Sequence, residues 1–281
     1  MKTILRGITN EVTIDTDGPV VIIGECINPT RRKKLVSTLQ TGDFSYVLEL
    51  AGTQIKAGAD VLDVNVGFPG VDDAAILPQT VLAIREKFDV PLCLDSPNPA
   101  AIEAALKVAG GRCLINSVNG EEKSLMAILP IAKEYGAAVI ALSMDEEGIT
   151  NEPEKRLAVA EKILNRAISQ GLQPEDVIVD PLAMAVSADP RACLVTLETI
   201  KLVHQKLGLN ITDGASNISF GLPGRETLNA AFMAMAIMNG LTCPIANPEK
   251  ITAFVRGSDL VLGRDDYAVR FVDYFQSLPL G

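Results

Sequence analysis

Short apolar runs alternate with longer amphipathic segments along most of the chain. The apolar runs have the length of β-strands, and the segments between them carry apolar residues at helical spacing. Capping signals mark some helix ends: Asn98 precedes Pro99 at one start, and Gly110-Gly111 follows that helix. Strands are predicted at 20–28, 60–67, 91–96, 113–117, 137–144, 177–181, 211–217 and 243–247. Helices are predicted at about 35–57, 74–88, 99–109, 121–135, 152–170, 191–207, 225–239, 248–257 and 265–278.

This alternation is typical of βαβ units and a parallel sheet, the α/β class. Repeated eight times, it favours a closed (β/α)8 TIM barrel over an open doubly wound sheet. No linker or low-complexity tract interrupts the pattern, so a single domain over residues 1–281 is expected. Residues 1–18 are predicted to form a short strand or arm that covers the bottom of the barrel.

Composition agrees with a barrel and argues against nucleic-acid binding and membrane contact. Hydrophobic residues make up 48% of the chain but aromatic residues only 4%, so the core must be aliphatic. The net charge of −10 argues against a nucleic-acid partner. No apolar stretch approaches the roughly 20 residues of a membrane span, and no cleavable leader is evident. A cytoplasmic protein without membrane contact is expected.

The cysteines and the single histidine give no sign of metal binding or nucleophilic catalysis. The five cysteines form no C-x-x-C pair, and Cys93, Cys113 and Cys243 lie in predicted strands, where a thiol is usually a small buried apolar group. His204, the single histidine, falls in the middle of a predicted helix. No metal site and no serine triad are therefore expected. Dinucleotide and phosphate-loop fingerprints are also missing from the sequence.

Most of the apolar runs end in an acid or an amide, which an aliphatic core does not need. Asp63 and Asn65 are two residues apart and share one face of their strand, and Asp95, Asn116 and Asp180 end later strands. The carboxyl ends of parallel strands are where α/β barrels keep their chemistry. A structural interpretation is that these groups bond to one another or cap the following helix, as Asp95 could do.

A ligand site is the alternative interpretation. A buried carboxylate without a partner costs several kcal/mol, and no arginine or lysine stands beside Asp95 or Asp180 in the sequence. A ligand rich in N–H donors would compensate. A pterin has such an edge: its 2-amino group and ring N3–H suit one carboxylate, and its other ring atoms suit asparagine amides.

The strand-end motifs resemble those of the pterin-binding methyltransferases. They are GECIN (24–28), DVNVG (63–67), LCLDS (92–96), INS (115–117), VDP (179–181) and GASNIS (214–219). The resemblance runs in order from about residue 20 to about residue 265. The family includes the methyltransferase acting on methyltetrahydrofolate and the corrinoid/iron–sulfur protein, and the folate domain of cobalamin-dependent methionine synthase. The chain is most similar to stand-alone members, such as those of glycine-betaine-type demethylation, and the resemblance implies a TIM barrel of the pterin-binding type.

The resemblance also implies residue roles. Asp95, Asn116 and Asp180 would hold the pterin ring, with Asp63 and Asn65 beside it. Asn217 would be the catalytic group that approaches N5, the nitrogen that gains or loses the methyl group. Two further residues, Ser219 and Arg225, would line the same mouth or touch the folate tail. The chain departs from the family by reading GECIN for the usual G-E-R-I-N, with Cys26 in place of arginine, and GASN for GLSN.

The implied reaction moves a methyl group between a methylated corrinoid protein and N5 of tetrahydrofolate. Orientation at N5 and the handling of one proton are the main tasks, for which no strong acid is evident in the sequence. The sequence around His204 lacks the aspartate and glycine of the D-x-H-x-x-G cobalamin motif, so a separate corrinoid protein is expected to bring the cobalamin. Relatives of this family are homodimers, and the Ala/Met-rich helix at 225–239 is predicted to be interface or, more simply, core.

Other functions remain as alternatives. A non-catalytic barrel subunit would scaffold a corrinoid complex without transferring a methyl group. Dihydropteroate synthase also binds a pterin in a barrel, but it carries an S-T-R-P-G loop after the second strand and basic residues near the end. Here FPGVDD (68–73) follows the second strand and is acidic where a diphosphate would need cations.

Overall fold

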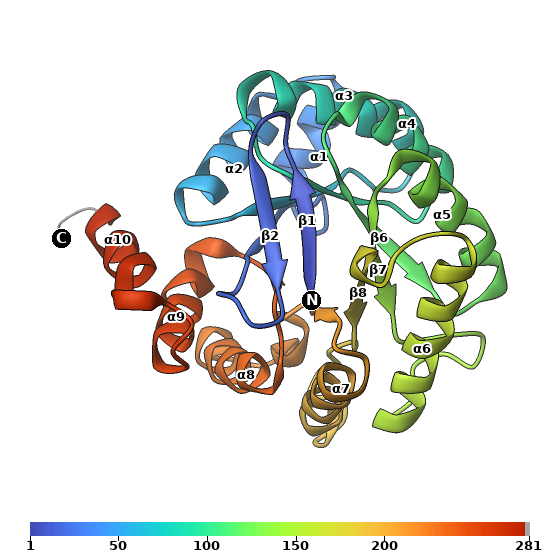
Figure 1. Cartoon of the computed structure of the whole chain (residues 1–281). Coiled ribbons are helices and arrows are strands. Elements are labelled where there is room, and N and C mark those ends of the chain that lie inside the picture. The colour runs from blue at the N-terminus through green and yellow to red at the C-terminus, as the bar shows by residue number, and fades with distance from the viewer. Residues whose placement is uncertain (279–281) are drawn as a thin grey trace.

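Parallel strands form a closed ring, as the sequence predicts. The computed structural model describes residues 1–278, and within them the barrel strands follow the order β10-β3-β4-β5-β6-β7-β8-β9 (Figure 1). Main-chain hydrogen bonds close the ring between β9 and β10, from Cys243 N to Ile211 O and from Ile245 N to Asp213 O, both 3.0 Å. The barrel strands are β3 (Ile23–Ile27), β4 (Val61–Asn65), β5 (Leu92–Asp95), β6 (Leu114–Asn119), β7 (Ala138–Leu142), β8 (Val177–Asp180), β9 (Asn210–Ile211) and β10 (Ile245–Ala246).

Helices follow the strands and surround the ring. The single helix expected at 35–57 is wrong: the segment forms two helices, because Gly42 takes a left-handed conformation (φ 71°) and Asp43 accepts a hydrogen bond from Ser45 N at the next helix start. The other predicted helices are confirmed. The helices are α1 (Lys33–Gln40), α2 (Ser45–Lys56), α3 (Asp73–Lys87), α4 (Pro99–Ala109), α5 (Glu122–Tyr135), α6 (Pro153–Ser169), α7 (Ala192–Leu207), α8 (Arg225–Asn239), α9 (Pro248–Val261) and α10 (Val269–Ser277), with short 3-10 turns at η1 (Pro174–Asp176), η2 (Asn217–Ser219) and η3 (Asp266–Ala268).

An N-terminal hairpin covers the bottom of the barrel. Its strands β1 (Lys2–Arg6) and β2 (Glu11–Asp15) are antiparallel and lie across the barrel end that faces the viewer in Figure 1. Leu5 and Ile14 are fully buried against the inner core. Asn210 at the start of β9 donates to Ile14 O (2.9 Å), which ties the hairpin to the ring. The predicted arm is therefore confirmed as a plug of the barrel.

Side chains inside the ring change from apolar to polar towards the carboxyl ends of the strands. The inner core contains Ile23, Val61, Cys93, Leu114 and Ile178. Because side chains alternate along a strand, the residue two places later points inward as well. Those residues are Glu25, Asp63, Asp95, Asn116 and Asp180. The barrel thus places a ring of acids and amides above its apolar interior.

The remaining sequence expectations concern cysteines and membrane contact. Cys93 and Cys243 are buried in the inner core and Cys113 between barrel and helices, all as free thiols, which confirms their apolar role. Among residues 1–278, no helix has both the length and the apolar character needed to cross a membrane.

Candidate active site at the barrel mouth

Adjacent strands β4, β5 and β6 hold one polar cluster. The Nδ2 of Asn65 donates to Asp95 Oδ2 (2.8 Å), and the Nδ2 of Asn116 donates to Asp63 Oδ1 (3.2 Å). Asn65 is fixed in turn because its Oδ1 accepts from Gly67 N (2.8 Å). Asn65 therefore orients a carboxyl group on the neighbouring strand β5, and Asn116 orients one on β4, across β5. The predicted residues of DVNVG, LCLDS and INS are brought together.

Burial changes the acidity of this cluster. Loss of water raises the pKa of Asp63 well above its usual range, and the negative charge of Asp95 raises it further, against the hydrogen bond from Asn116. Burial also raises the pKa of Asp95, although the bond from Asn65 opposes the change. Both carboxyl groups therefore resist ionisation, and the effect is stronger at the more deeply buried Asp63.

Asp95 and Asn116 open into a cleft of about 470 Å³. Ser117, Asn119 and Leu142 also line it, so the cleft combines polar groups with one aliphatic surface. Asp63 lies beneath this cleft with 2% of its surface exposed. A flat ring with N–H donors along one edge would find both a polar and an apolar contact here.

Asp180 ends β8, which β7 separates from this cluster in the ring. Its Oδ1 accepts from Leu182 N (2.7 Å), and its side chain is 9% exposed. Burial raises the pKa of Asp180 to about 6, while the Leu182 bond and the charge of Arg156 hold it down. Because the Leu182 bond uses only Oδ1, Oδ2 has no hydrogen-bond donor among the described residues.

A buried arginine from α6 supports the loop after Asp180. Arg156 is fully buried and donates to Thr150 O (2.7 Å), Pro181 O (2.6 Å) and Leu182 O (2.8 Å). Asp213 after β9 accepts from Ala183 N (3.1 Å) on the same loop. Burial and the nearby Asp180 raise the pKa of Asp213 well above its usual range. Sequence reasoning missed both residues, because Arg156 has the pattern of a solvated helix residue and Asp213 lies inside a run taken to end at Asn217.

Asn217 lies in a second cleft, of about 510 Å³, on the other side of the mouth. It begins η2, is exposed, and folds its amide over Gly214, where a Cβ atom would come within 2.8 Å of Asn217 Nδ2. Arg225 lines the same cleft and donates to Ser219 Oγ (3.0 Å) and Ser216 O (2.8 Å). Ser219 is fully buried, so it positions Arg225 and does not face the cleft.

Glu25 is an acid in the Asn217 cleft that the sequence reasoning did not single out. Burial raises its pKa, opposed by a hydrogen bond from Ser216 (3.4 Å) and by the charges of Arg225 and Arg32. Glu25 is thus a weak acid in the same cleft as Asn217, and that no strong acid serves the reaction stays a prediction. The signal was present in the sequence, since Glu25 follows Ile23 by two residues within an apolar strand.

Other polar strand ends have structural roles. Asn247 caps α9 by accepting from Glu249 N (3.0 Å), while Asn28 and Asp145 accept from backbone N–H groups two residues later in their loops. Helix α4 is capped by Asn98, so the capping role considered for Asp95 is wrong.

Comparisons with known proteins show the family of this chain. The sequence profile of the family described as Pterin binding enzyme matches residues 24–247. The chain belongs to this family. Methylcorrinoid:tetrahydrofolate methyltransferase of Eubacterium limosum is 28% identical over 272 residues, covering 93% of this chain and 98% of the relative. Methionine synthase of Mycobacterium tuberculosis is 32% identical over 248 residues, but the match covers only 21% of that longer protein.

Solved structures share the fold of this pterin-binding enzyme. Dihydropteroate synthase of Yersinia pestis superposes with a TM-score of 0.69 at 16% identity, over 94% of this chain and 99% of that one. The 7,8-dihydropteroate synthase of Vibrio fischeri ES114 gives a TM-score of 0.69 at 18% identity, again over 94% and 99%. Identities this low show the barrel fold alone.

The polar groups at the barrel mouth of this chain have hydrogen-bond chemistry that would suit a pterin. Asp95 and Asp180 each use one oxygen within the protein, which leaves an acceptor for a ring N–H. Asn116 donates through Nδ2, so its Oδ1 is available as a further acceptor. Asp95 and Asp180 end β5 and β8, and Asn116 lies within β6, all on the inner face of one ring. Acceptors therefore predominate where a 2-aminopterin edge would present donors.

Proposed function

We propose that this pterin-binding enzyme transfers a methyl group between a methylated corrinoid protein and N5 of tetrahydrofolate, forming or using 5-methyltetrahydrofolate. The arrangement of Asp95, Asn116 and Asp180 as acceptors around one mouth, with Asn217 across from them, carries the proposal. The match to a methylcorrinoid:tetrahydrofolate methyltransferase over 98% of that protein supports it.

In this proposal Asp95, Asn116 and Asp180 bind the pterin edge. Asp63 and Asn65 act through them, because Asn65 orients Asp95 and Asp63 receives the bond from Asn116. Held in this way, the ring keeps N5 at a fixed place, and such positioning can supply much of the rate enhancement of a displacement.

Proton handling at N5 falls to the Asn217 cleft. A methylated N5 leaves more readily when it is protonated, and an unmethylated N5 attacks only with a free lone pair. The amide of Asn217 can donate or accept a hydrogen bond, so it can serve both directions. Glu25, whose pKa is raised by burial, lies in the same cleft and can take part in proton transfer. When its carrier protein docks over the mouth, the corrinoid supplies the cobalt that gives or accepts the methyl group.

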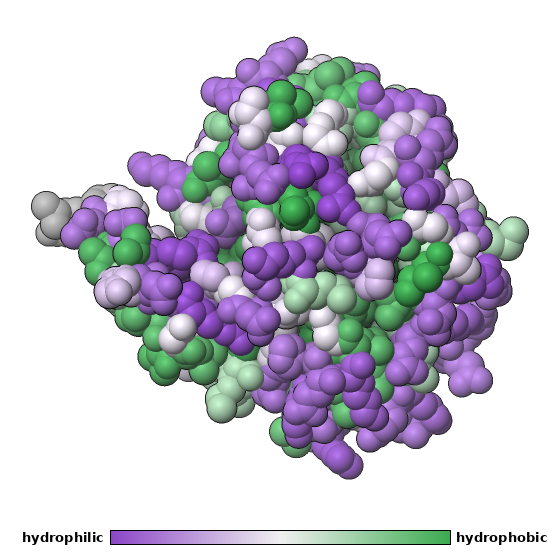
Figure 2. All heavy atoms as spheres, viewed as in Figure 1, coloured by the Kyte–Doolittle hydropathy of each residue, from purple (hydrophilic) through white to green (hydrophobic). Residues whose placement is uncertain are grey.

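We also propose that the protein is a homodimer and is located in the cytoplasm. One face of α8 is core, with Phe232 and Met233 buried, whereas Met238 is 74% exposed. Val261 at the end of α9 is 85% exposed, and Figure 2 shows hydrophobic residues gathered over α9 and α10. Contiguous apolar surface of this kind is typical of subunit interfaces. Light scattering of the protein and of Val261→Lys tests the dimer.

The test of function measures binding and transfer separately. Calorimetry with tetrahydrofolate should show binding that Asp180→Ala abolishes. Tetrahydrofolate with free methylcob(III)alamin as the methyl donor should give 5-methyltetrahydrofolate, followed anaerobically by absorbance. Asn217→Ala should lower the transfer rate about 10- to 100-fold with little change in the dissociation constant. Asn239→Ala, which removes an amide at the far end of α8, is the matched control.

Two results would refute the proposal in different ways. If tetrahydrofolate binds neither the protein nor Asp180→Ala, the pterin site is wrong. A second outcome is that tetrahydrofolate binds but no methyl group is transferred. If Asn217→Ala then also binds a corrinoid protein as tightly as the parent does, the barrel is a scaffold subunit. Formation of dihydropteroate from a pterin diphosphate and p-aminobenzoate would indicate the remaining alternative.

A further inference from the structure

A run of basic residues stands at the barrel mouth of an otherwise acidic protein. Arg31, Arg32, Lys33 and Lys34 are consecutive in a chain of net charge −10. They occupy the loop after β3 and the first turn of α1. This loop follows the carboxyl end of its strand, so the positive charge lies at the same end of the barrel as Asp95 and Asp180.

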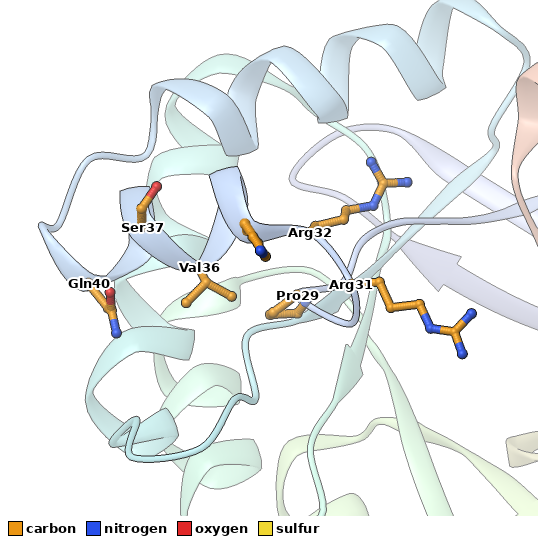
Figure 3. Close-up of a pocket in the computed structure, with 7 residues that line it drawn as sticks. Pro29, Arg31, Arg32, Val36, Ser37 and Gln40 are labelled. Atoms are coloured by element: carbon orange, nitrogen blue, oxygen red, sulfur yellow. The ribbon is translucent and has the colours of Figure 1, made fainter.

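The basic loop borders the Asn217 cleft. Arg31 and Arg32 both line that cleft of about 510 Å³, and both also line a neighbouring pocket of about 310 Å³ that continues along α1 past Lys33. Figure 3 shows the guanidinium groups of Arg31 and Arg32 extending to the same side of the loop, away from Ser37 and Gln40. The two arginines therefore join the candidate active-site cleft to a second, outer pocket.

Most of this charge has no acidic partner. Lys34 pairs with Glu49 (3.3 Å), but among residues 1–278 no ion pair within 4.0 Å involves Arg31, Arg32 or Lys33. Arg32 partly offsets the charge of the buried Glu25. Arg31 stacks over the ring of Phe220 (5.1 Å), which holds its guanidinium at the cleft. Arg31 and Lys33 thus remain available to an anion.

A pterin ring does not call for these cations, because the groups that would face it are carboxylates and amides. The rest of a folate is different: its glutamyl tail carries carboxylates, and each added γ-linked glutamate adds another. Such a tail would extend out of the acidic barrel mouth. Its negative charge would be stabilised by positively charged side chains along its path.

We propose that Arg31, Arg32 and Lys33 form a subsite for the glutamyl tail, so that the enzyme prefers tetrahydrofolates carrying several glutamates. The inference rests on the proposed function for the identity of the ligand. The monoglutamate reaches the inner part of the cleft beside Arg225, and the added glutamates extend along the basic loop into the outer pocket.

Calorimetry with monoglutamyl and triglutamyl tetrahydrofolate tests the subsite. The parent protein should bind the triglutamate about tenfold more tightly in 50 mM salt, the combined effect of exposed ion pairs. That preference should fall to about twofold in 0.5 M salt, because screening shortens the range of exposed charges. Arg31→Gln/Lys33→Gln should lose the preference while binding the monoglutamate within about threefold of the parent.

The control removes the same charge elsewhere. Lys56 and Lys206 are exposed in the last turns of α2 and α7, at the opposite end of the barrel, so Lys56→Gln/Lys206→Gln should keep the preference. Equal binding of both folates by the parent, or equal loss in the control, overturns the subsite but leaves methyl transfer standing. Binding of neither folate overturns the proposed function. If Arg31→Gln/Lys33→Gln slows only transfer from the corrinoid protein and keeps the tail preference, the loop serves that partner and the subsite is wrong.

Discussion

Replacing Asp180 by asparagine should stabilise the protein while weakening binding at the proposed pterin site. The side chain is 9% exposed, and burial raises its pKa from 3.8 to about 6. Asparagine has nearly the same shape, and its Oδ1 can still accept from Leu182 N. The substitution therefore removes a buried charge without opening a cavity or leaving that N–H unsatisfied.

The size and sign of the effect follow from the pKa. Because the folded state binds the Asp180 proton more tightly than the unfolded chain, its stability falls as the pH rises from about 4 to about 6. Above that range the ionised carboxylate costs the folded state about 3 kcal/mol. The charge of Asp180 also raises the pKa of Asp213, so removing it in Asp180→Asn relieves a second unfavourable interaction and does not reduce this gain.

Urea denaturation at several pH values measures this effect. Asp180→Asn should match the parent near pH 4 and exceed it by about 2–3 kcal/mol at pH 8, with the difference developing between those values. Tetrahydrofolate should bind the variant about 10- to 100-fold more weakly at pH 7, because a charge-assisted hydrogen bond is replaced by an amide contact. A variant less stable than the parent at pH 8, or a difference that does not change with pH, would refute the reasoning.

Further substitutions test the parts that support the site. Arg156→Met should destabilise the protein by about 2–4 kcal/mol in urea denaturation, because it leaves buried carbonyls without donors. Gly214→Ala should slow methyl transfer more than it weakens tetrahydrofolate binding in calorimetry, because the new Cβ displaces the amide of Asn217. Leu5→Ala should cost about 2–4 kcal/mol by the same denaturation assay and leave the dissociation constant unchanged, because the plug lies at the far end of the barrel.

Most of the fold could be predicted because strand and helix periodicities differ. In several strands an inward-facing apolar residue is followed two places later by an acid or amide, as in Val61-Asp63 and Cys93-Asp95. This pattern identifies both the strand and the strand end at which the candidate site lies. The break between α1 and α2 escaped because apolar spacing continues across Gly42. Only the left-handed conformation of that glycine interrupts the helix, and periodicity does not report it.

The supporting residues of the site could not be predicted by the same reasoning. Arg156 stands in an amphipathic helix, and its contacts with Pro181 and Leu182 join residues about 25 positions apart in sequence. Asp213 lies beyond the end of β9, and its contact with Ala183 N joins residues 30 positions apart in sequence. Tertiary packing alone brings these residues under the loop that follows Asp180.

The hydrogen bonds of the polar strand ends favour a ligand site over a purely structural role. If they only bonded to one another, the pairs Asn65–Asp95 and Asn116–Asp63 would satisfy them. Each pair instead uses one carboxylate oxygen, and Asp180 uses one oxygen on a backbone N–H. Burial meanwhile raises the pKa of Asp63, Asp95 and Asp180, so each ionised form costs folding free energy that a neutral amide would not. A purely structural layer would be more stable with asparagine at these positions. These carboxylates lower the stability of the fold and keep acceptor oxygens that the protein does not use. A ligand rich in N–H donors would bind to such oxygens.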